Sequence, residues 1–213
     1  MRFGMMRFLL ALSLLIPVPA LAQESSPEEF VKKITAEIME AIKSDKQLQA
    51  GDKQKAMKLA EEKIIPHVDF EEATRLAVGR GWKQASPEQQ KKLVAEFKNM
   101  LVRTYSNAIS AYEGQEMKVL PSRNKPGETD ATVRNQFIRP GGKPVLVDYS
   151  MKKTDRGWKI YDIVVEGVSL VLTYRSEFDA VVKQEGIDGL IKRLSSKNTA
   201  PAAIGGTAPS PKK

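Results

Sequence analysis

The sequence predicts an α+β fold, in which a curved antiparallel sheet of about four strands carries helices on its concave side. Two observations predict this class. Apolar residues recur at helical spacing over residues 27–112, whereas they follow a period of two between residues 116 and 165. Helical spacing then returns and continues to residue 196. Helices, then strands, then helices again are typical of layered α+β packing.

The first helix is predicted by a start signal, Ser26-Pro27-Glu28-Glu29. A capping serine, a proline at the first helical position and a glutamate three residues after the serine all favour helix initiation. We expect this helix to end near Ser44. Two further helices are expected over residues 52–65 and 70–78, since an aspartate precedes or begins each one and a proline or a glycine follows it.

The longest helix is expected to begin at a second start signal, Ser86-Pro87-Glu88-Gln89, and to close near Gly114. Segments with Gly and Pro then separate the strands as hairpin turns. Two final helices are expected over residues 169–185 and 187–196. The four strands are expected over residues 116–120, 129–139, 144–153 and 157–165.

The most informative segment spans residues 161–178, where a strand period turns into a helix period. Residues 161–165 are nearly all apolar, which is typical of a strand covered on both faces. The hinge Glu166-Gly167 follows, and we expect a helix to begin at Ser169. In this interpretation the side chains of Glu166 and Ser169 cap that helix, and Gly167 provides backbone freedom.

The two ends of the chain indicate an exported protein. Residues 1–22 combine two arginines, an apolar core and Ala20-Leu21-Ala22, which together predict a cleaved signal peptide. The apolar core of about ten residues is far shorter than the roughly 20 that span a bilayer. Residues 23–196 are expected to form a single domain, and residues 197–213 a disordered tail rich in Pro, Ala and Gly. A periplasmic or secreted location follows.

Composition argues against two classes of function. The net charge of +8 falls to +3 over residues 23–196, because five of the 34 basic residues lie outside that range and all 26 acidic residues lie inside it. Basic and acidic residues are interspersed there, so we expect no nucleic acid as a partner. The chain has no cysteine, which excludes disulfides, thiol chemistry and a thioether-linked lipid anchor.

Catalytic motifs are largely missing. His67 is the only histidine, so paired-histidine metal sites cannot form, and no nucleotide-binding glycine loop is present. We therefore expect no metal and no cofactor. Asp148 and Asp162 lie on adjacent predicted strands and Glu166 follows them, so these carboxylates are acid–base candidates, with exposed strand positions or helix caps as their ordinary alternative. Trp82 is interpreted as a core residue, with a ligand-binding wall as the alternative.

Several motifs together resemble one known family. Tyr161-Asp-Ile-Val-Val-Glu-Gly-Val-Ser-Leu170 and Gly186-Ile-Asp-Gly-Leu190 are similar to segments of the periplasmic phospholipid-binding MlaC proteins, also called toluene-tolerance or ABC-transporter auxiliary-component proteins. Asp69-Phe70, residues 79–82, residues 85–89 and residues 105–112 also fit. The resemblance covers most of residues 27–195, and several ordered motifs are more specific than any single one.

The resemblance implies an NTF2-like curved sheet whose helices enclose acyl chains. It also implies a periplasmic carrier that moves phospholipid between an outer-membrane lipoprotein complex and an inner-membrane ABC transporter complex, and so maintains outer-membrane lipid asymmetry. Phospholipid is then the cargo rather than a cofactor, the chain is not an enzyme, and we expect it to act as a monomer.

Acyl chains are expected to lie between the concave face of the sheet and the helices. Each candidate residue is apolar or aromatic and has an ordinary core role as its alternative. The candidates are Phe97, Leu101, Tyr105, Tyr149, Ile163, Val165, Val168, Val171 and Tyr174.

Three other functions remain open from the sequence. One is a carrier for a hopanoid-type or other apolar lipid. Another is an exported NTF2-like enzyme that acts on a small apolar substrate, with Asp148, Asp162 or His67 as its acid or base. The third is an interaction module or chaperone that binds other proteins through its helices.

Overall fold

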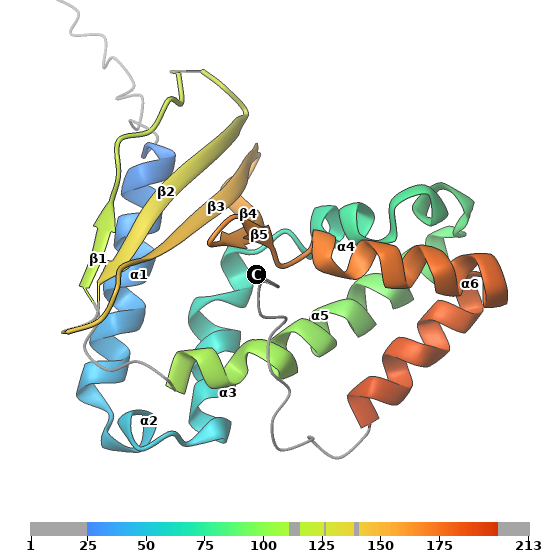
Figure 1. Ribbon diagram of the computed structural model, residues 1–213, viewed down its shortest axis with the longest axis horizontal. Coiled ribbons are helices and arrows are strands. Elements are labelled where there is room, and N and C mark those ends of the chain that lie inside the picture. Colours follow the sequence, from blue (N-terminus) through green and yellow to red (C-terminus); the bar gives the residue numbers. More distant parts are fainter. Residues whose placement is uncertain (1–24, 111–115, 126, 139–140, 200–213) are drawn as a thin grey trace, which may run out of the picture.

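The computed structural model describes residues 25–110, 116–125, 127–138 and 141–199 (Figure 1). The predicted signal peptide and the predicted helix end at Gly114 lie outside these residues. Within them, helix α1 runs along the sheet, helices α4, α5 and α6 form a second layer, and α3 lies between the two (Figure 1). The helices are α1 (Pro27–Ser44), α2 (Lys46–Gln49), α3 (Lys53–Lys63), α4 (Phe70–Val78), α5 (Pro87–Ser110) and α6 (Arg175–Thr199), with short 3-10 turns η1 (Ile65–His67), η2 (Gly79–Gln84) and η3 (Leu172–Tyr174).

The sheet is an antiparallel meander in which each strand pairs with the next along the chain. This arrangement confirms the predicted α+β class. The four predicted strands are present, and a fifth strand of two residues, which the sequence analysis did not predict, pairs with the fourth. The strands are β1 (Glu116–Val119), β2 (Asp130–Ile138), β3 (Val145–Thr154), β4 (Gly157–Val165) and β5 (Val168–Ser169).

Both predicted helix start signals are confirmed by reciprocal hydrogen bonds. The backbone N–H of Glu29 donates to Ser26 Oγ at 3.1 Å, and the backbone N–H of Ser26 donates to Glu29 Oε2 at 3.0 Å. Ser86 and Gln89 make the same pair of bonds at the start of α5. Each pair satisfies donors that a helix N-terminus otherwise leaves free.

The prediction that a helix begins at Ser169 is wrong. Glu166 and Gly167 both have positive φ, 49° and 81°, and Val165 pairs directly with Val168. This geometry is that of a two-residue hairpin turn, whose twist matches that of the strands it joins. The chain therefore turns back as β5, passes through η3, and enters α6 only at Arg175.

Helix α6 consists of two helices joined at Gly186, in agreement with the two helices predicted there. Gly186 has φ 71° and ψ −174°, a conformation that is essentially restricted to glycine. A Cβ on Gly189 would lie 2.2 Å from Cβ of Glu185, so the bend also requires glycine at this second position. The helix continues to Thr199, past the predicted start of the tail at Lys197, and the rest of that tail lies outside the described residues.

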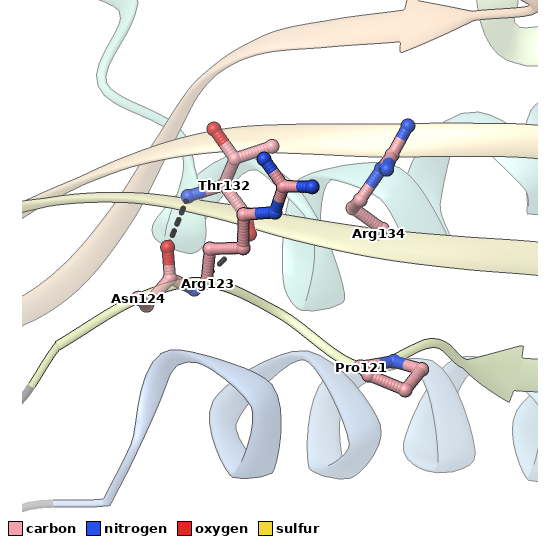
Figure 2. A pocket seen from close by; sticks show the side chains of 5 residues that line it. All are labelled: Pro121, Arg123, Asn124, Thr132 and Arg134. Carbon is pink, nitrogen blue, oxygen red and sulfur yellow. Dashed lines mark hydrogen bonds between the residues drawn. The ribbon is translucent and has the colours of Figure 1, made fainter.

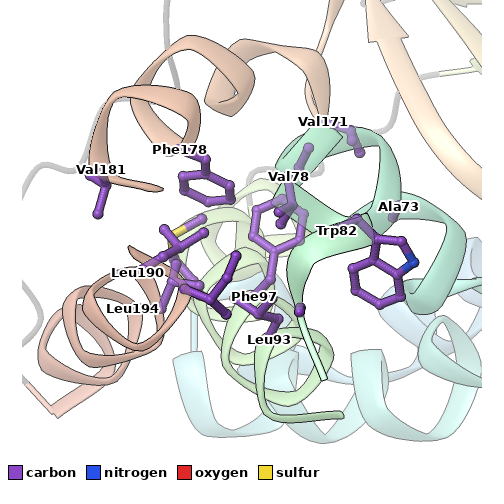
Figure 3. Packing of buried hydrophobic residues seen from close by; sticks show 14 residues of the cluster. Ala73, Val78, Trp82, Leu93, Phe97, Val171, Phe178, Val181, Leu190 and Leu194 are labelled. Carbon is purple, nitrogen blue, oxygen red and sulfur yellow. The ribbon is translucent and has the colours of Figure 1, made fainter. Parts of the chain in front are cut away.

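Buried apolar side chains form separate clusters in the two layers. The helical cluster lies between α4, α5 and α6 and includes Phe97, Phe178 and Leu190 (Figure 3). Trp82 belongs to it, as the core interpretation predicted. The sheet cluster joins Val31 of α1 to Val133 of β2 and its neighbours on β3 and β4. Among the residues that the structure describes, these two clusters share none.

None of the helices in the described part of the chain is both long enough and apolar enough to cross a membrane.

Candidate functional site

The face of the sheet that packs on α1 carries a continuous apolar block. Successive side chains of a strand point to opposite faces, and directly paired residues share a face. The register therefore places Tyr149 beside Ile163 and Val147 beside Val165, on the same face as Val133. Tyr149, Ile163 and Val165 are only half-buried, as is Val147. Part of the apolar surface of this block is therefore left accessible by the residues of the sheet cluster.

The helical layer carries three of the four aromatic candidates, Phe97, Tyr105 and Tyr174. The rings of Phe97 and Tyr174 lie 5.5 Å apart, edge to face, and Phe178 stacks on Tyr174 at 5.7 Å. Leu101 is half-buried and packs against the same cluster, one helical turn before Tyr105 on α5. Phe97 and Val171 are fully buried there, at 0% and 4% exposure.

The nine candidates therefore fall into two groups on two different layers. Tyr149, Ile163, Val165 and Val168 belong to the sheet and its hairpin, whereas the other five belong to α5 or to the segment between β5 and α6. Within the helical group, Leu101, Tyr105 and Tyr174 are only partly buried. The contact of any of the nine with a lipid remains a prediction.

Two of the candidate tyrosines stay protonated far above neutral pH. Burial raises the pKa of Tyr149 to about 12. Burial also raises the pKa of Tyr105, and the neighbouring Tyr174 raises it further. The Tyr105 hydroxyl oxygen is buried and has no hydrogen-bond partner of ordinary geometry among the described residues. A neutral phenol in this position can donate a hydrogen bond to an acceptor such as an ester carbonyl.

Asp162 holds the β4–β5 hairpin and the segment after it together. Its Oδ2 accepts from Ser169 Oγ at 2.5 Å, and its Oδ1 accepts from the backbone N–H groups of Ile163 at 2.8 Å and Val171 at 3.1 Å. The residue is only 7% exposed. These bonds position Val168 and Val171 relative to the sheet.

Neither of the two predicted capping roles is confirmed. Ser169 Oγ accepts from the backbone N–H of Leu172, the first residue of η3, at 2.9 Å, but the predicted helix begins only at Arg175, so Ser169 does not cap it. The carboxylate of Glu166 instead accepts from the backbone N–H of Leu146 on β3, so its predicted role as a helix cap is wrong. Its position in a hairpin turn places it beside β3 rather than at a helix start.

The acid–base candidates are engaged in structural contacts. Asp148 lies on the outer face of the sheet, 3.4 Å from Arg134 Nε. The ring of His67 packs edge to face on Phe30 at 5.4 Å, and burial, together with Lys159, lowers its pKa. Among the described residues, no three His, Cys, Asp or Glu side chains gather in a way that could hold a metal ion.

Two surface hollows lie away from the nine candidates. One, of about 340 Å³, is open to the surface and lies beside Arg123, Asn124 and Arg134; Asn124 is hydrogen-bonded there to the backbone of Thr132 (Figure 2). The other, of about 290 Å³, lies where α3, α5 and the end of α6 meet. Neither hollow is lined by any of the nine candidates.

Comparison with known proteins shows where this arrangement occurs elsewhere. The family profile described as MlaC protein matches residues 32–196, which is most of the chain. The chain belongs to the MlaC family. The match includes the β4–β5 hairpin and the bend at Gly186, the two segments that carried the resemblance in the sequence.

Two relatives match similar shares of the chain. The intermembrane phospholipid transport system binding protein MlaC of Haemophilus influenzae is 23% identical over 181 residues, which is 84% of this chain and 85% of the relative. The toluene tolerance protein ttg2D of Pseudomonas putida is 24% identical over 183 residues, 85% of this chain and 84% of the relative.

A solved structure is more similar in sequence. The phospholipid-binding protein of Ralstonia solanacearum, solved in complex with a phospholipid, is 36% identical, with a TM-score of 0.75. The alignment covers 82% of this chain and 97% of that structure. The overall fold described above is therefore shared with a protein that holds a phospholipid.

Proposed function

We propose that this chain is a non-enzymatic periplasmic carrier that binds phospholipid and moves it between an outer-membrane lipoprotein complex and an inner-membrane ABC transporter complex. In this role it contributes to outer-membrane lipid asymmetry and acts as a monomer. The observation that carries the proposal is the 36% identity, over nearly the whole of the solved chain, to a phospholipid-bound structure. The half-buried apolar block on the sheet supports it.

The energetics of transfer require that the cargo be enclosed. Each methylene exposed to water costs about 0.8 kcal/mol, so two acyl chains with about 30 methylenes cost roughly 24 kcal/mol to expose. A carrier must therefore cover most of both chains, whereas a head group can remain in water. We place the chains between the apolar block of the sheet and the helical group of candidates, with Tyr105 as a donor to an ester oxygen.

The proposal is tested by native mass spectrometry, with organic extraction, of the mature protein purified from a bacterial periplasm without detergent. We expect a stoichiometric phospholipid in the spectrum and in the extract. If the extract contains a hopanoid-type lipid instead, the cargo of the carrier is that lipid class and not phospholipid. A protein that is empty, and that also takes no lipid from phospholipid vesicles, would overturn the carrier function.

The placement of the chains is tested by Leu101→Gln. A buried amide without a hydrogen bond costs about 1–3 kcal/mol against an acyl chain, which corresponds to roughly 5- to 150-fold weaker lipid binding. We expect the variant to fold and to carry much less lipid in the same mass spectrum. Val171 is a poorer test site, because at 4% exposure a polar group there would disrupt the core itself.

Leu76→Gln is the matched control for this variant. Leu76 is also half-buried and packs against the same cluster, but it lies on α4 and is not among the candidates. Both variants are expected to lose similar stability, and only Leu101→Gln should lose lipid. A full complement of lipid in Leu101→Gln would show that the chains lie elsewhere.

A further inference from the structure

Asn135 is a polar side chain enclosed by apolar neighbours on the inner face of the sheet. It is 0% exposed and lies in the middle of β2. The register pairs it with Val119 of β1 and Val147 of β3, and Val133 and Phe137 flank it on the same face of its own strand. A buried amide in such surroundings is expected to have all its hydrogen bonds satisfied.

The orientation of this amide is determined by its partners. Nδ2 of Asn135 donates to the backbone oxygen of Val133 at 2.9 Å and to that of Val147 at 3.2 Å. Both partners are carbonyl oxygens, which only accept, so the group that faces them is the NH₂ and not the oxygen. The carbonyl oxygen of the amide must then point away from these two partners.

That oxygen is buried and has no hydrogen-bond partner among the described residues. Leaving a buried acceptor unpaired costs folding free energy. The oxygen can still accept a hydrogen bond from an O–H or an N–H donor. Asn135 lies where the closed sheet cluster around Val133 meets the half-buried residues Phe137 and Val147. A molecule that lies along the apolar block would meet the amide at this boundary.

We infer that Asn135 is a binding residue that accepts a hydrogen bond from a hydroxyl group on the buried part of the cargo. This inference rests on the proposed carrier function and adds a preference to it. The carrier selects lipids with a free hydroxyl, on the glycerol or along the acyl chain, over lipids that offer only acceptors there. One added hydrogen bond corresponds to roughly 2- to 10-fold tighter binding.

Two pairs of matched probes test this preference and separate the two sources of the hydroxyl. The first pair is 1-palmitoyl-2-hydroxy-glycero-3-phosphocholine and its 2-deoxy analogue, in which the choline head group adds no donor. The second pair is 12-hydroxystearic acid and stearic acid. We expect the delipidated full-length mature protein to prefer the hydroxylated member of one pair by roughly 2- to 10-fold.

Asn135→Leu is the variant that tests the residue. Leucine has nearly the same size and suits the apolar face. We expect it to abolish the preference, while the member of each pair that lacks the hydroxyl binds as before. Gln136→Leu is the control: the same kind of change on the next residue of β2, which faces the other side of the sheet, should leave the preference intact.

Equal affinities for both members of both pairs in the wild-type protein would overturn the inference, and this measurement needs no variant. An unchanged preference in Asn135→Leu would overturn it as well. Failure of the carrier function itself would look different, since the wild-type protein would then take up no diacyl phospholipid from vesicles. Uptake of diacyl lipid without any hydroxyl preference contradicts the role of Asn135 alone.

Discussion

Phe97→Ala is expected to lower the free energy of unfolding by about 3–5 kcal/mol, the usual cost of removing a fully buried phenylalanine. Phe97 is 0% exposed, and its ring meets those of Tyr174 and Phe178 edge to face at 5.5 and 5.3 Å. The substitution leaves a cavity in the helical cluster and removes both aromatic contacts. Chemical denaturation followed by circular dichroism measures the change.

Phe137→Ala serves as the comparison for this prediction. Phe137 is only half-buried and lies on β2, so its loss should cost clearly less stability. If Phe97→Ala costs less than about 1 kcal/mol, the ring does not act as a core residue. Such a result would favour its role as a wall of the lipid site over its role in the helical cluster.

Asp162→Ala is expected to lower the free energy of unfolding by about 3 kcal/mol, because it removes a buried acceptor and leaves its donors unpaired. The backbone N–H of Val171 and the hydroxyl of Ser169 both lose their partner. Asp162→Asn keeps one acceptor oxygen and should recover part of the loss. Urea denaturation of the three proteins gives the order wild type, Asn variant, Ala variant.

Asp148→Ala is the control, since Asp148 lies on the neighbouring strand and pairs with Arg134 at 3.4 Å near solvent. Exposed ion pairs of this kind contribute about 0.2–1 kcal/mol. Equal losses for the two alanine variants would contradict the structural role of Asp162. An esterase activity that vanishes in Asp162→Ala while stability is unchanged would instead support the rival enzyme function.

Local signals in the sequence predicted much of the fold. The starts of α1 and α5 depend on residues three apart, Ser26 with Glu29 and Ser86 with Gln89, so no tertiary contact is needed to recognise them. The bend at Gly186 was likewise predicted as a break between two helices. The change of period at residue 116 located the sheet in the same way.

The errors occurred where tertiary pairing decides between local alternatives. Val168 and Ser169 fit the helical spacing of the residues that follow, yet they pair with Val165 and Val164 as a strand. Two consecutive residues with positive φ indicate a hairpin turn, but Glu166 is not a residue that usually marks one. Ser169 and the backbone N–H of Val171 then donate to Asp162, and the helix begins only at Arg175.

The sequence predicted which types of residue line the candidate site, but it did not predict how these residues are arranged in space. Periodicity identifies which residues face inward, and the half-buried Val165 was among those named, although Val147 beside it was not. It does not distinguish Phe97, enclosed in a cluster, from Leu101, which is only half-buried. Asn135 was missed because a single polar residue in a strand has meaning only once the cross-strand register shows its neighbours to be apolar.

The absence, in the described part of the chain, of any shared residue between the helical cluster and the sheet cluster has a consequence for how this chain can diverge. Energetic effects of substitutions at sites without shared partners usually add rather than interact. Stabilising substitutions around Phe178 therefore do not limit which residues can replace Tyr149 or Ile163. A lineage can retain the helical layer as its source of stability and still alter the sheet face to suit a different lipid.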